Sequence, residues 1–256
     1  MRIRCLGTGT SFGVPMIGCD CPVCRSSDLH NHRYRCSVLL ELPGGNLLID
    51  TPPELRLACL NNDISKVDAV ALTHTHADHV MGMDDLRAFT MKSDQPMPIY
   101  AEPQFLDDVR RIFRYVFVKT QEGGGKPRLN LCPLESGRPV EILGAPVLPL
   151  RVMHGDLPVT AFRIGRFAYV TDVRVIPGET MDALRNLDVL ILGAIRMKPH
   201  STHLSIPEAM EVARELAPAQ TFFTHMTHNV DHEELSRLLP PGMAPAHDGM
   251  AIEVSL

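Results

Sequence analysis

The sequence has no tryptophan, few aromatic residues of any kind and no long hydrophobic run. No apolar stretch approaches the roughly 20 residues that a membrane-spanning helix needs, so contact with a membrane is not expected. Low-complexity tracts and short repeats are also missing, which argues against a disordered or fibrous chain. With 45% hydrophobic and 21% charged residues, the composition is that of a globular protein, and residues 1–256 are predicted to form a single domain.

A signal peptide and an excess of basic residues are missing as well. Met1–Cys5 leads directly into a strand-like pattern, so a cytoplasmic location is expected. The chain has 25 Lys and Arg against 30 Asp and Glu, which gives a net charge of -5. This balance argues against a protein whose whole surface binds nucleic acid. The expected partners are a small-molecule substrate and, in a homodimer, a second copy of the chain.

Cysteine and histidine are distributed unusually. Seven cysteines is an odd number, and Cys19, Cys21 and Cys24 fall within six residues. A secreted disulfide framework is therefore not expected, and metal binding is the better interpretation. Histidine favours the same conclusion, because the chain has 12 His against 4 Tyr and places three of them in the stretch 74–79.

Short β-branched runs alternate with amphipathic stretches along the chain. The patterns predict strands at Arg2–Leu6, Ser37–Leu42, Asn46–Ile49, Val67–Thr73, Pro98–Ala101, Val147–Met153, Ala161–Ile164, Phe167–Thr171, Val189–Leu192, Thr221–Thr224 and Ala251–Val254. They predict helices at Pro53–Leu60, His79–Met91, Gln104–Tyr115, Pro177–Leu184, Ile206–Leu216 and His232–Leu239, and a loop at Gln121–Lys126. Strands precede helices twice over, which predicts an α/β fold, a four-layer αββα sandwich of two similar halves.

The strongest motif is His74-Thr75-His76-Ala77-Asp78-His79, between a buried-strand pattern and a helix. Histidines two apart in extended chain share a face, while Asp78 and His79 at the helix start project from the turn beside them. Four ligands from six residues can serve two adjacent ions. Imidazole and carboxylate ligands suit Zn or Mn.

This His-x-His-x-Asp-His signature resembles that of the metallo-β-lactamase superfamily. The resemblance implies further site residues at the ends of other strands, which are matched here by Asp50, His154, Asp172 and His225. It implies one ion held by His74, His76 and His154, a second held by Asp78, His79 and His225, and Asp172 as the bridge between them. Asp50 is implied to steady the histidine loop.

A second motif is the segment 18–24, Gly-Cys-Asp-Cys-Pro-Val-Cys. Thiolates at this spacing converge on one tetrahedral zinc site and leave a fourth position open, for which His30 and His32 are candidates by proximity. Together with Leu6-Gly7-Thr8-Gly9-Thr10 and Gly13-Val14-Pro15, the motif resembles the phosphoribosyl cyclic phosphodiesterase branch of the superfamily. That resemblance implies His228 as the fourth ligand. A quinone-cofactor biosynthesis protein shares the cysteine pattern.

His203 precedes a helix whose start, Ser205-Ile206-Pro207-Glu208, is a capping box with proline in the first turn. In the same branch, a histidine at this position is implied to be the general acid that protonates the leaving alkoxide. The helix N-terminus is expected to lower its pKa. His200 is the nearest alternative candidate. The simpler interpretation is that His203 is a surface histidine beside a helix, without a catalytic role.

These features predict a metal-dependent phosphodiesterase acting on small cyclic phosphodiesters, such as a ribosyl 1,2-cyclic phosphate or a cyclic nucleotide. The expected cofactors are two divalent ions, Zn or Mn, and one structural Zn, and the residues expected to take part in catalysis are Asp78, Asp172 and His203. Water activated to hydroxide by the paired ions is expected to attack phosphorus.

The same features are compatible with two alternative functions. The first is an RNA-processing endonuclease of the ribonuclease Z type, against which the acidic net charge counts. The basic helix around Arg110, Arg111 and Arg114 is interpreted as a solvated face, and Arg87 as part of an intrahelical ion pair. The second is a non-catalytic carrier protein of the quinone-cofactor type, which the complete set of ligands argues against.

Overall fold

The strands of the protein form two seven-stranded sheets, as seen in a computed structural model that describes residues 1–93, 95–119 and 125–255. The first sheet has the order β14-β1-β2-β3-β4-β5-β6, with strands β1 (Arg2–Gly7), β2 (Ser37–Leu42), β3 (Gly45–Ile49), β4 (Ala69–Ala71), β5 (Met97–Ala101), β6 (Leu129–Pro133) and β14 (Ala251–Glu253). The second has the order β13-β12-β11-β10-β9-β8-β7, with β7 (Val140–Ile142), β8 (Ala145–His154), β9 (Leu157–Ile164), β10 (Phe167–Val170), β11 (Val189–Gly193), β12 (Gln220–Thr224) and β13 (Met243–Pro245).

Both sheets are mixed in the same way. In the first sheet, the pairs from β14 to β3 are antiparallel and those from β3 to β6 are parallel. In the second, the pairs from β7 to β10 are antiparallel and those from β10 to β13 are parallel. The predicted division into two similar halves is thus confirmed.

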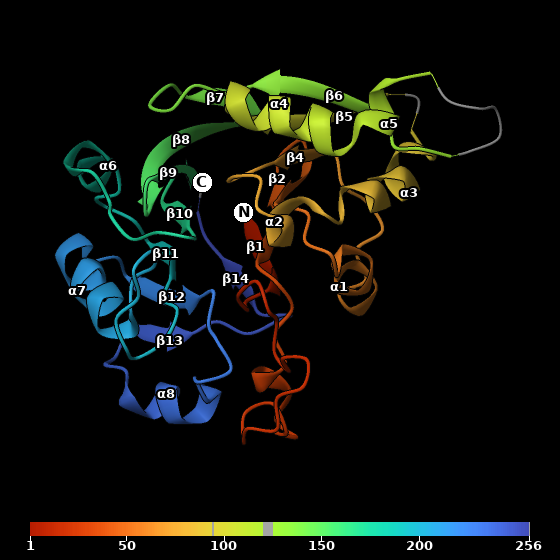
Figure 1. The fold of residues 1–256 in the computed structure, drawn as a ribbon. Helices are drawn as coiled ribbons and strands as arrows, with labels where there is room; N and C mark the ends of the chain where they lie inside the picture. The colour runs from red at the N-terminus through yellow and green to blue at the C-terminus, as the bar shows by residue number, and fades with distance from the viewer. Residues whose placement is uncertain (94, 120–124, 256) are drawn as a thin grey trace.

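The sheets pack face to face, and helices cover their outer faces. Alternate residues of each strand point to opposite sides of its sheet, so Leu40 and Leu47 contact the second sheet, whereas Leu39 and Leu48 pack under the helices of the first half. Figure 1 shows α1 and α3 on one side of the sandwich and α6 and α7 on the other. This arrangement is the predicted four-layer αββα sandwich.

The helices are short. They are α1 (Leu55–Asn61), α2 (Ala77–Val80), α3 (Arg87–Thr90), α4 (Pro103–Ile112), α5 (Arg114–Phe117), α6 (Gly178–Ala183), α7 (Ile206–Leu216) and α8 (His232–Leu238), with 3₁₀ turns η1 (Leu29–Asn31) and η2 (Met83–Leu86). The capping box of α7 is confirmed, because the backbone N–H of Ser205 donates to Glu208 and the Ser205 side chain accepts from the backbone N–H of Glu208. None of the helices in the described ranges is both long and apolar enough to cross a bilayer.

The single helix predicted at 79–91 is wrong, because the segment divides into α2, η2 and α3. The break falls at Gly82, whose N–H donates to the carbonyl of Thr51. A Cβ at this position would lie 2.0 Å from the carbonyl oxygen of Pro52. Close packing of the turn against residues 51–52 therefore outweighs the local helical pattern. The helix predicted at 104–115 likewise divides into α4 and α5 at Phe113.

Strands β6, β7 and β13 were not predicted from the sequence patterns. They are the outermost strands of their sheets, and two of them have only three residues. Such short edge strands carry little alternation of polar and apolar residues. The loop predicted at 121–126 falls on residues 121–124, which lie outside the described residues.

The N-terminal loop between β1 and β2 crosses to the second half of the molecule. Asn31 donates a hydrogen bond to Asp231 and accepts one from the backbone N–H of His232, at the start of α8. Figure 1 shows this loop, in red, beside α8. The cysteine motif is thereby brought close to the late part of the chain.

Candidate metal centres

The residues of the main centre follow the carboxyl ends of several strands. Asp50 follows β3, the histidine motif follows β4, Asp172 lies two residues beyond β10, His225 follows β12, and His154 is the last residue of β8. His76 caps α2 in extended conformation, and Asp78 and His79 lie in the first turn of that helix. The predicted placement of the motif between a strand and a helix is confirmed.

Three of these residues have an uncommon backbone conformation. Asp50, Asp172 and His225 have φ values of 64°, 47° and 61°. Non-glycine residues seldom enter this left-handed region, and they do so where the surrounding structure requires it. Each lies just after a central strand, so the turn there directs its side chain into the site.

Asp172 lies at the middle of the main centre. Its Oδ2 is 3.2 Å from Nε2 of His79, and its Oδ1 is 3.1 Å from Nε2 of His225. Asp78 approaches the same two nitrogens, at 3.3 Å from His79 and 3.9 Å from His225. Asp172 also shares a group of converging ligand atoms with His74 and His79, and another with His154 and His203, so its carboxylate lies between the two proposed sets of ligands.

The remaining histidines lie around this group. The ring of His74 is 4.5 Å from that of His76 and 6.2 Å from that of His154, measured between centroids. His203 lies 4.3 Å from His154 and 4.8 Å from His225. Ligand atoms come within 4.8 Å of one another in three groups: His74, His79 and Asp172; Asp78, His79 and His225; and His154, Asp172 and His203. His76 belongs to none of these groups.

Several histidines are oriented by a hydrogen bond at the nitrogen that faces away from the centre. Asp50 accepts from Nδ1 of His79 at 2.7 Å, and also from the backbone N–H and hydroxyl of Thr73. Nδ1 of His154 donates to the carbonyl of Thr202 at 2.8 Å. Such a bond fixes the tautomer and leaves Nε2 as the metal-binding atom. The steadying role expected of Asp50 is therefore confirmed.

The buried nitrogens that remain fit metal ions. Within the described part of the chain, Nε2 of His74, His79 and His225 is buried without a hydrogen-bond partner. A buried polar atom without a partner costs free energy, and native proteins rarely leave several together. Ions coordinated by these nitrogens and by Asp78 and Asp172 would satisfy them. The donor set of imidazoles and carboxylates therefore fits a divalent metal centre.

The charges of the site support the same conclusion. Burial disfavours ionisation of Asp172, but His225 and His79 outweigh it and hold its pKa well below the usual value. Burial is likewise outweighed at Asp78, where His225 and His79 lower the pKa. For His74, burial and the neighbouring His79 lower the pKa well below 6.5. At neutral pH the centre thus contains two carboxylates and a neutral His74. Burial is outweighed by the carboxylates at His79 and His225, whose pKa values are raised, that of His225 to about 9, so an ion bound here would displace protons from these two rings.

His203 lies against this centre, with Nδ1 3.9 Å from Oδ1 of Asp172. Burial, followed by the positive charge of His225, lowers its pKa to about 3. The predicted direction of the shift agrees with this result, whereas the main cause is burial rather than the helix N-terminus. His200, the alternative candidate, lies 5.1 Å from His203 between ring centroids, one step farther from Asp172.

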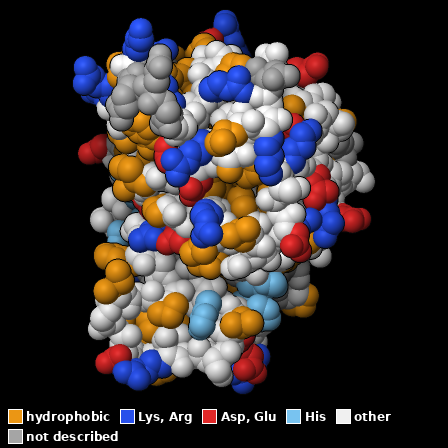
Figure 2. Space-filling model, turned by 90° about the vertical axis from the view of Figure 1, so that its right-hand side faces the viewer, with side chains coloured by type: hydrophobic (Ala, Val, Ile, Leu, Met, Phe, Trp, Pro, Cys, Tyr) orange, Lys and Arg blue, Asp and Glu red, His pale blue; other side chains and the backbone are white. Residues whose placement is uncertain are grey.

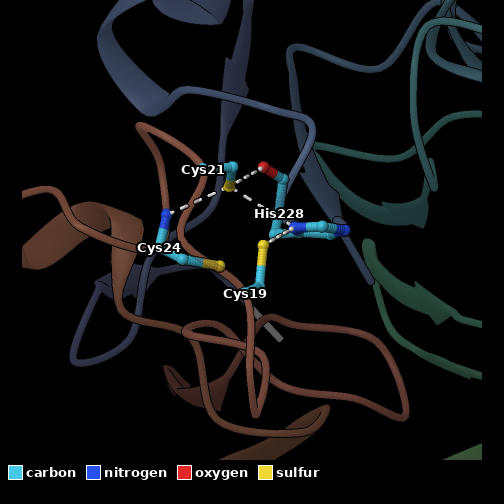
Figure 3. Close-up of side chains that lie close together, drawn as sticks. All are labelled: Cys19, Cys21, Cys24 and His228. Atoms are coloured by element: carbon cyan, nitrogen blue, oxygen red, sulfur yellow. Dashed lines mark hydrogen bonds between the residues drawn. The ribbon is translucent and has the colours of Figure 1, made fainter.

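The second centre is formed by the cysteine motif and His228. Figure 3 shows the three thiols and the imidazole directed toward one another, and their ligand atoms all lie within 4.8 Å. Nδ1 of His228 is 3.1 Å from Sγ of Cys19 and 3.4 Å from Sγ of Cys21. In tetrahedral zinc sites the N–S edge is about 3.5 Å, so the geometry fits zinc. His228 therefore joins the three cysteines, as the resemblance implied.

His30 and His32 lie elsewhere. The ring of His30 contacts those of His232 and His247, and Nε2 of His32 lies 3.1 Å from the carbonyl of Ser26.

The backbone N–H of Cys24, aided by His228, lowers the pKa of Cys21 to about 6. At neutral pH this sulfur is a thiolate, which is the form that binds metal.

Polar groups that orient the site and residues that surround it are not predicted by the sequence patterns. Thr73 binds Asp50, and the carbonyl of Thr202 binds His154; no residue pattern marks such contacts. Phe12 and Arg196 line a cavity next to His203 and His225. Phe12 lies in the segment Thr10–Gly13, close to the glycine-rich motif, which is the one signal that could have drawn attention to it.

Comparisons with known proteins agree with this geometry. The protein is 38% identical to a structure described as a new diphosphatase from the PhnP family, with a TM-score of 0.93 and coverage of 100% of this chain and 98% of that one. It is also 38% identical over 253 residues to an octanoyltransferase of Porphyromonas gingivalis, covering 98% of this chain and 51% of the relative. The chain thus spans about half the length of that relative.

A structure of Zn²⁺-bound PqqB from Methylobacterium extorquens has a TM-score of 0.81 at 19% identity and covers 99% of this chain and all of that one, which shows a shared fold. The family described as "Beta-lactamase superfamily domain" matches residues 45–226, more than half of the chain and the segment that carries all the ligands of the main centre. The chain therefore belongs to the beta-lactamase superfamily and has the metallo-β-lactamase fold.

Proposed function

We propose that the protein is a phosphodiesterase that hydrolyses small cyclic phosphodiesters, such as a ribosyl 1,2-cyclic phosphate or a cyclic nucleotide. The main support is the set of buried, unpartnered ring nitrogens around Asp172, which fits two adjacent ions. Further support comes from the similarity to a PhnP-family diphosphatase of nearly equal length, whose name indicates that it acts on a phosphate linkage.

In this proposal His74, His76 and His154 hold one ion, Asp78, His79 and His225 hold the other, and Asp172 bridges them. When bound, two divalent ions, Zn or Mn, lower the pKa of a water and neutralise charge on phosphoryl oxygens. A zinc ion held by Cys19, Cys21, Cys24 and His228 has a structural role. Asp50 and Thr202 keep the nitrogens of His79 and His154 directed at the centre.

His203 is the proton donor to the departing oxygen. In the protein without substrate its pKa is about 3, so the imidazole is neutral. A bound phosphodiester brings negative charge, which favours the protonated imidazole. The proposed role therefore requires that substrate binding raise the pKa of His203, so that the imidazolium can donate its proton to the leaving alkoxide as the bond to phosphorus breaks.

The endonuclease alternative requires a basic surface, and the contacts of the candidate helix argue against one. Arg110 and Arg111 pair with Asp107 and Asp108 within α4. Arg87 pairs with Asp84, as predicted. Figure 2 shows one face of the molecule on which Lys and Arg side chains stand apart and several lie beside Asp or Glu. These pairs leave few charges for phosphates of a long RNA.

The other names among the relatives carry less weight. The octanoyltransferase is about twice as long as the matched segment, so its activity is not assigned to this segment. A carrier role like that of a quinone-cofactor protein needs no oriented metal ligands or proton donor. The hydrogen bonds that Asp50 and the carbonyl of Thr202 accept from the site histidines, and the position of His203, therefore favour catalysis.

The location and assembly expected from the sequence belong to the same proposal. A thiolate zinc site requires reduced cysteines, which supports a cytoplasmic location. Size-exclusion chromatography with light scattering would test the expected homodimer.

The proposal is tested by assaying ribose 1,2-cyclic phosphate, a 2′,3′-cyclic nucleotide and precursor tRNA side by side over a series of salt concentrations. We expect the small esters to be hydrolysed with little dependence on salt, and precursor tRNA to be cleaved weakly. Faster cleavage of the tRNA with a steep salt slope would establish the endonuclease instead. Failure to hydrolyse any of the three, in protein that elemental analysis shows to hold three metals per chain, would contradict the phosphodiesterase.

A further inference from the structure

A cavity of about 260 Å³ lies between the main centre and the N-terminal loop. His203 and His225 form one wall, and His228 forms part of another. The remaining lining includes Phe12, Ile195 and Arg196. A substrate whose phosphate lies at the main centre therefore has space for a further part of its structure on this side of the molecule.

Phe12 gives this cavity an aromatic surface. Its side chain is 67% exposed, although a phenyl ring gains free energy by burial. The ring stands on the turn from Thr10 to Gly13, which is closed by a hydrogen bond from the N–H of Gly13 to the carbonyl of Thr10. Nε of Arg35 donates to the carbonyl of Ser11 and holds the same turn. Phe12 is thus presented at the cavity by a braced segment.

Arg196 gives the cavity a positive charge. Its hydrogen bonds within the described part of the chain go to the carbonyls of Lys198 and Pro199, so no carboxylate there neutralises the guanidinium. The carbonyl of Arg196 accepts from the N–H of Ile206, which ties its backbone to the start of α7. A guanidinium held in this way is suited to a phosphate or carboxylate.

We infer that this cavity is a subsite for a nucleotide-like part of the substrate, in which a base stacks on Phe12 and a second phosphate pairs with Arg196. The inference rests on the proposed function and narrows it to phosphodiesters that carry a heteroaromatic base and a second anionic group. Aromatic rings accept any base through its π-face, whereas a charged pair adds selectivity for the anion. A bare ribosyl phosphate would leave the subsite empty.

Two substitutions that remove a side-chain group, each compared with a conservative substitution that keeps the group, test the subsite. Phe12→Ala removes the ring and Phe12→Tyr keeps it, while Arg196→Gln removes the charge and Arg196→Lys keeps it. Lys198→Gln is the control, because it removes a neighbouring charge that does not line the cavity. The substrates are adenosine 2′,3′-cyclic phosphate with and without a 5′-phosphate, and ribose 1,2-cyclic phosphate, which has no base.

We expect Phe12→Ala to raise KM for both adenosine esters by roughly 5- to 100-fold and to leave the ribose ester unchanged. Arg196→Gln is expected to raise KM roughly 10- to 100-fold, only for the ester with the 5′-phosphate. Values of kcat should change little, because neither residue contacts the reacting atoms. Equal effects on all three esters would show that the residues act on the centre as a whole and would overturn the subsite.

Binding is measured separately, by calorimetric titration of adenosine 2′,5′-bisphosphate into each protein. Weaker binding to Phe12→Ala and Arg196→Gln, with unchanged binding to Lys198→Gln, supports the subsite even if no ester is hydrolysed. In that case the proposed phosphodiesterase activity alone is wrong. Unchanged affinity in both variants overturns the subsite, whatever the wild-type enzyme hydrolyses.

Discussion

The two metal centres are linked by a segment of four residues, yet they are built in different ways. In the main centre, His74, His79, Asp172 and His225 are buried at the ends of central strands. In the cysteine centre, three ligands come from a loop whose buried cluster contains only Val14, Val23 and Cys24. The first centre is shaped by the two sheets, whereas the second has little structure of its own to shape it.

This structural difference predicts different roles for the ions proposed at the two centres. Asp50 and the carbonyl of Thr202 accept hydrogen bonds from His79 and His154 and orient these two rings independently of any ion. The ions proposed for this centre would therefore serve catalysis more than folding. The thiols of the cysteine centre are contacted by the backbone N–H groups of Met16 and Cys24 and by His228. A zinc ion bound there, as we propose, would stabilise the loop and, through His228, the segment that follows His225.

The largest effect should come from Asp172→Ala, which removes the carboxylate proposed to bridge the two ions of the main centre. We expect phosphodiesterase activity to fall by more than ~100-fold, because even residues that only orient metal ligands cost up to about that much. Elemental analysis should show loss of the two main-centre ions and retention of the cysteine-bound zinc. Asp182→Ala, on the exposed side of α6, is the matched control. Loss of all three metals would contradict the independence of the two centres.

His203→Ala should separate proton transfer from metal binding inside the main centre. Both ions should remain, and turnover of alkyl esters should fall by roughly 10²- to 10⁴-fold, the usual contribution of a general acid. An activated aryl ester should be spared, because its leaving group needs little protonation. His200→Ala is the control. Equal losses on alkyl and aryl esters, or loss of an ion, would show that His203 binds rather than protonates.

Asp50→Asn tests whether the main centre is oriented before metal binds. Asparagine tolerates the left-handed backbone at this position, so the turn is preserved while the charge that holds Nδ1 of His79 is lost. We expect metal affinity to fall by about 10- to 100-fold, as measured by competition with a chelator. Unchanged affinity would show that the ions themselves orient His79, as zinc is proposed to do for the cysteine loop.

Cys21→Ser should have the smallest effect on activity and a clear effect on stability. We expect the loss of one zinc, a fall in Tm of about 5–10 °C, and less than about a tenfold loss of activity. Cys132→Ser, a half-buried cysteine on β6 outside the motif, is the control. The structural role of the site would be refuted by unchanged zinc content, and an activity loss as large as that of Asp172→Ala would show that the two centres are not separable.

Much of the fold could be predicted because it depends on local patterns. Residues 69–72 are continuously apolar because β4 is covered on both faces, and the start of α7 follows from the Ser205 capping box. The division of the segment 79–91 could not be predicted. It depends on the approach of Gly82 to the carbonyl of Pro52, a contact between segments about 30 residues apart.

The candidate sites divide in the same way. Residue type and spacing identified the motif at 74–79 and the three cysteines as candidate metal ligands, because imidazole, carboxylate and thiolate groups at those intervals have few other uses. Spacing left His30 and His32 as candidates for the fourth ligand; the family resemblance implied His228, and the tertiary structure places His228 beside the cysteines. Only the tertiary structure decided that Phe12 and Arg196 line one cavity beside His203. The physical reason is that the sequence specifies the chemical type of each side chain, and hence its ligand atoms. The convergence of these side chains depends instead on the packing of the two sheets and on the turns at Asp172 and His225, whose left-handed backbone is not dictated by local preference.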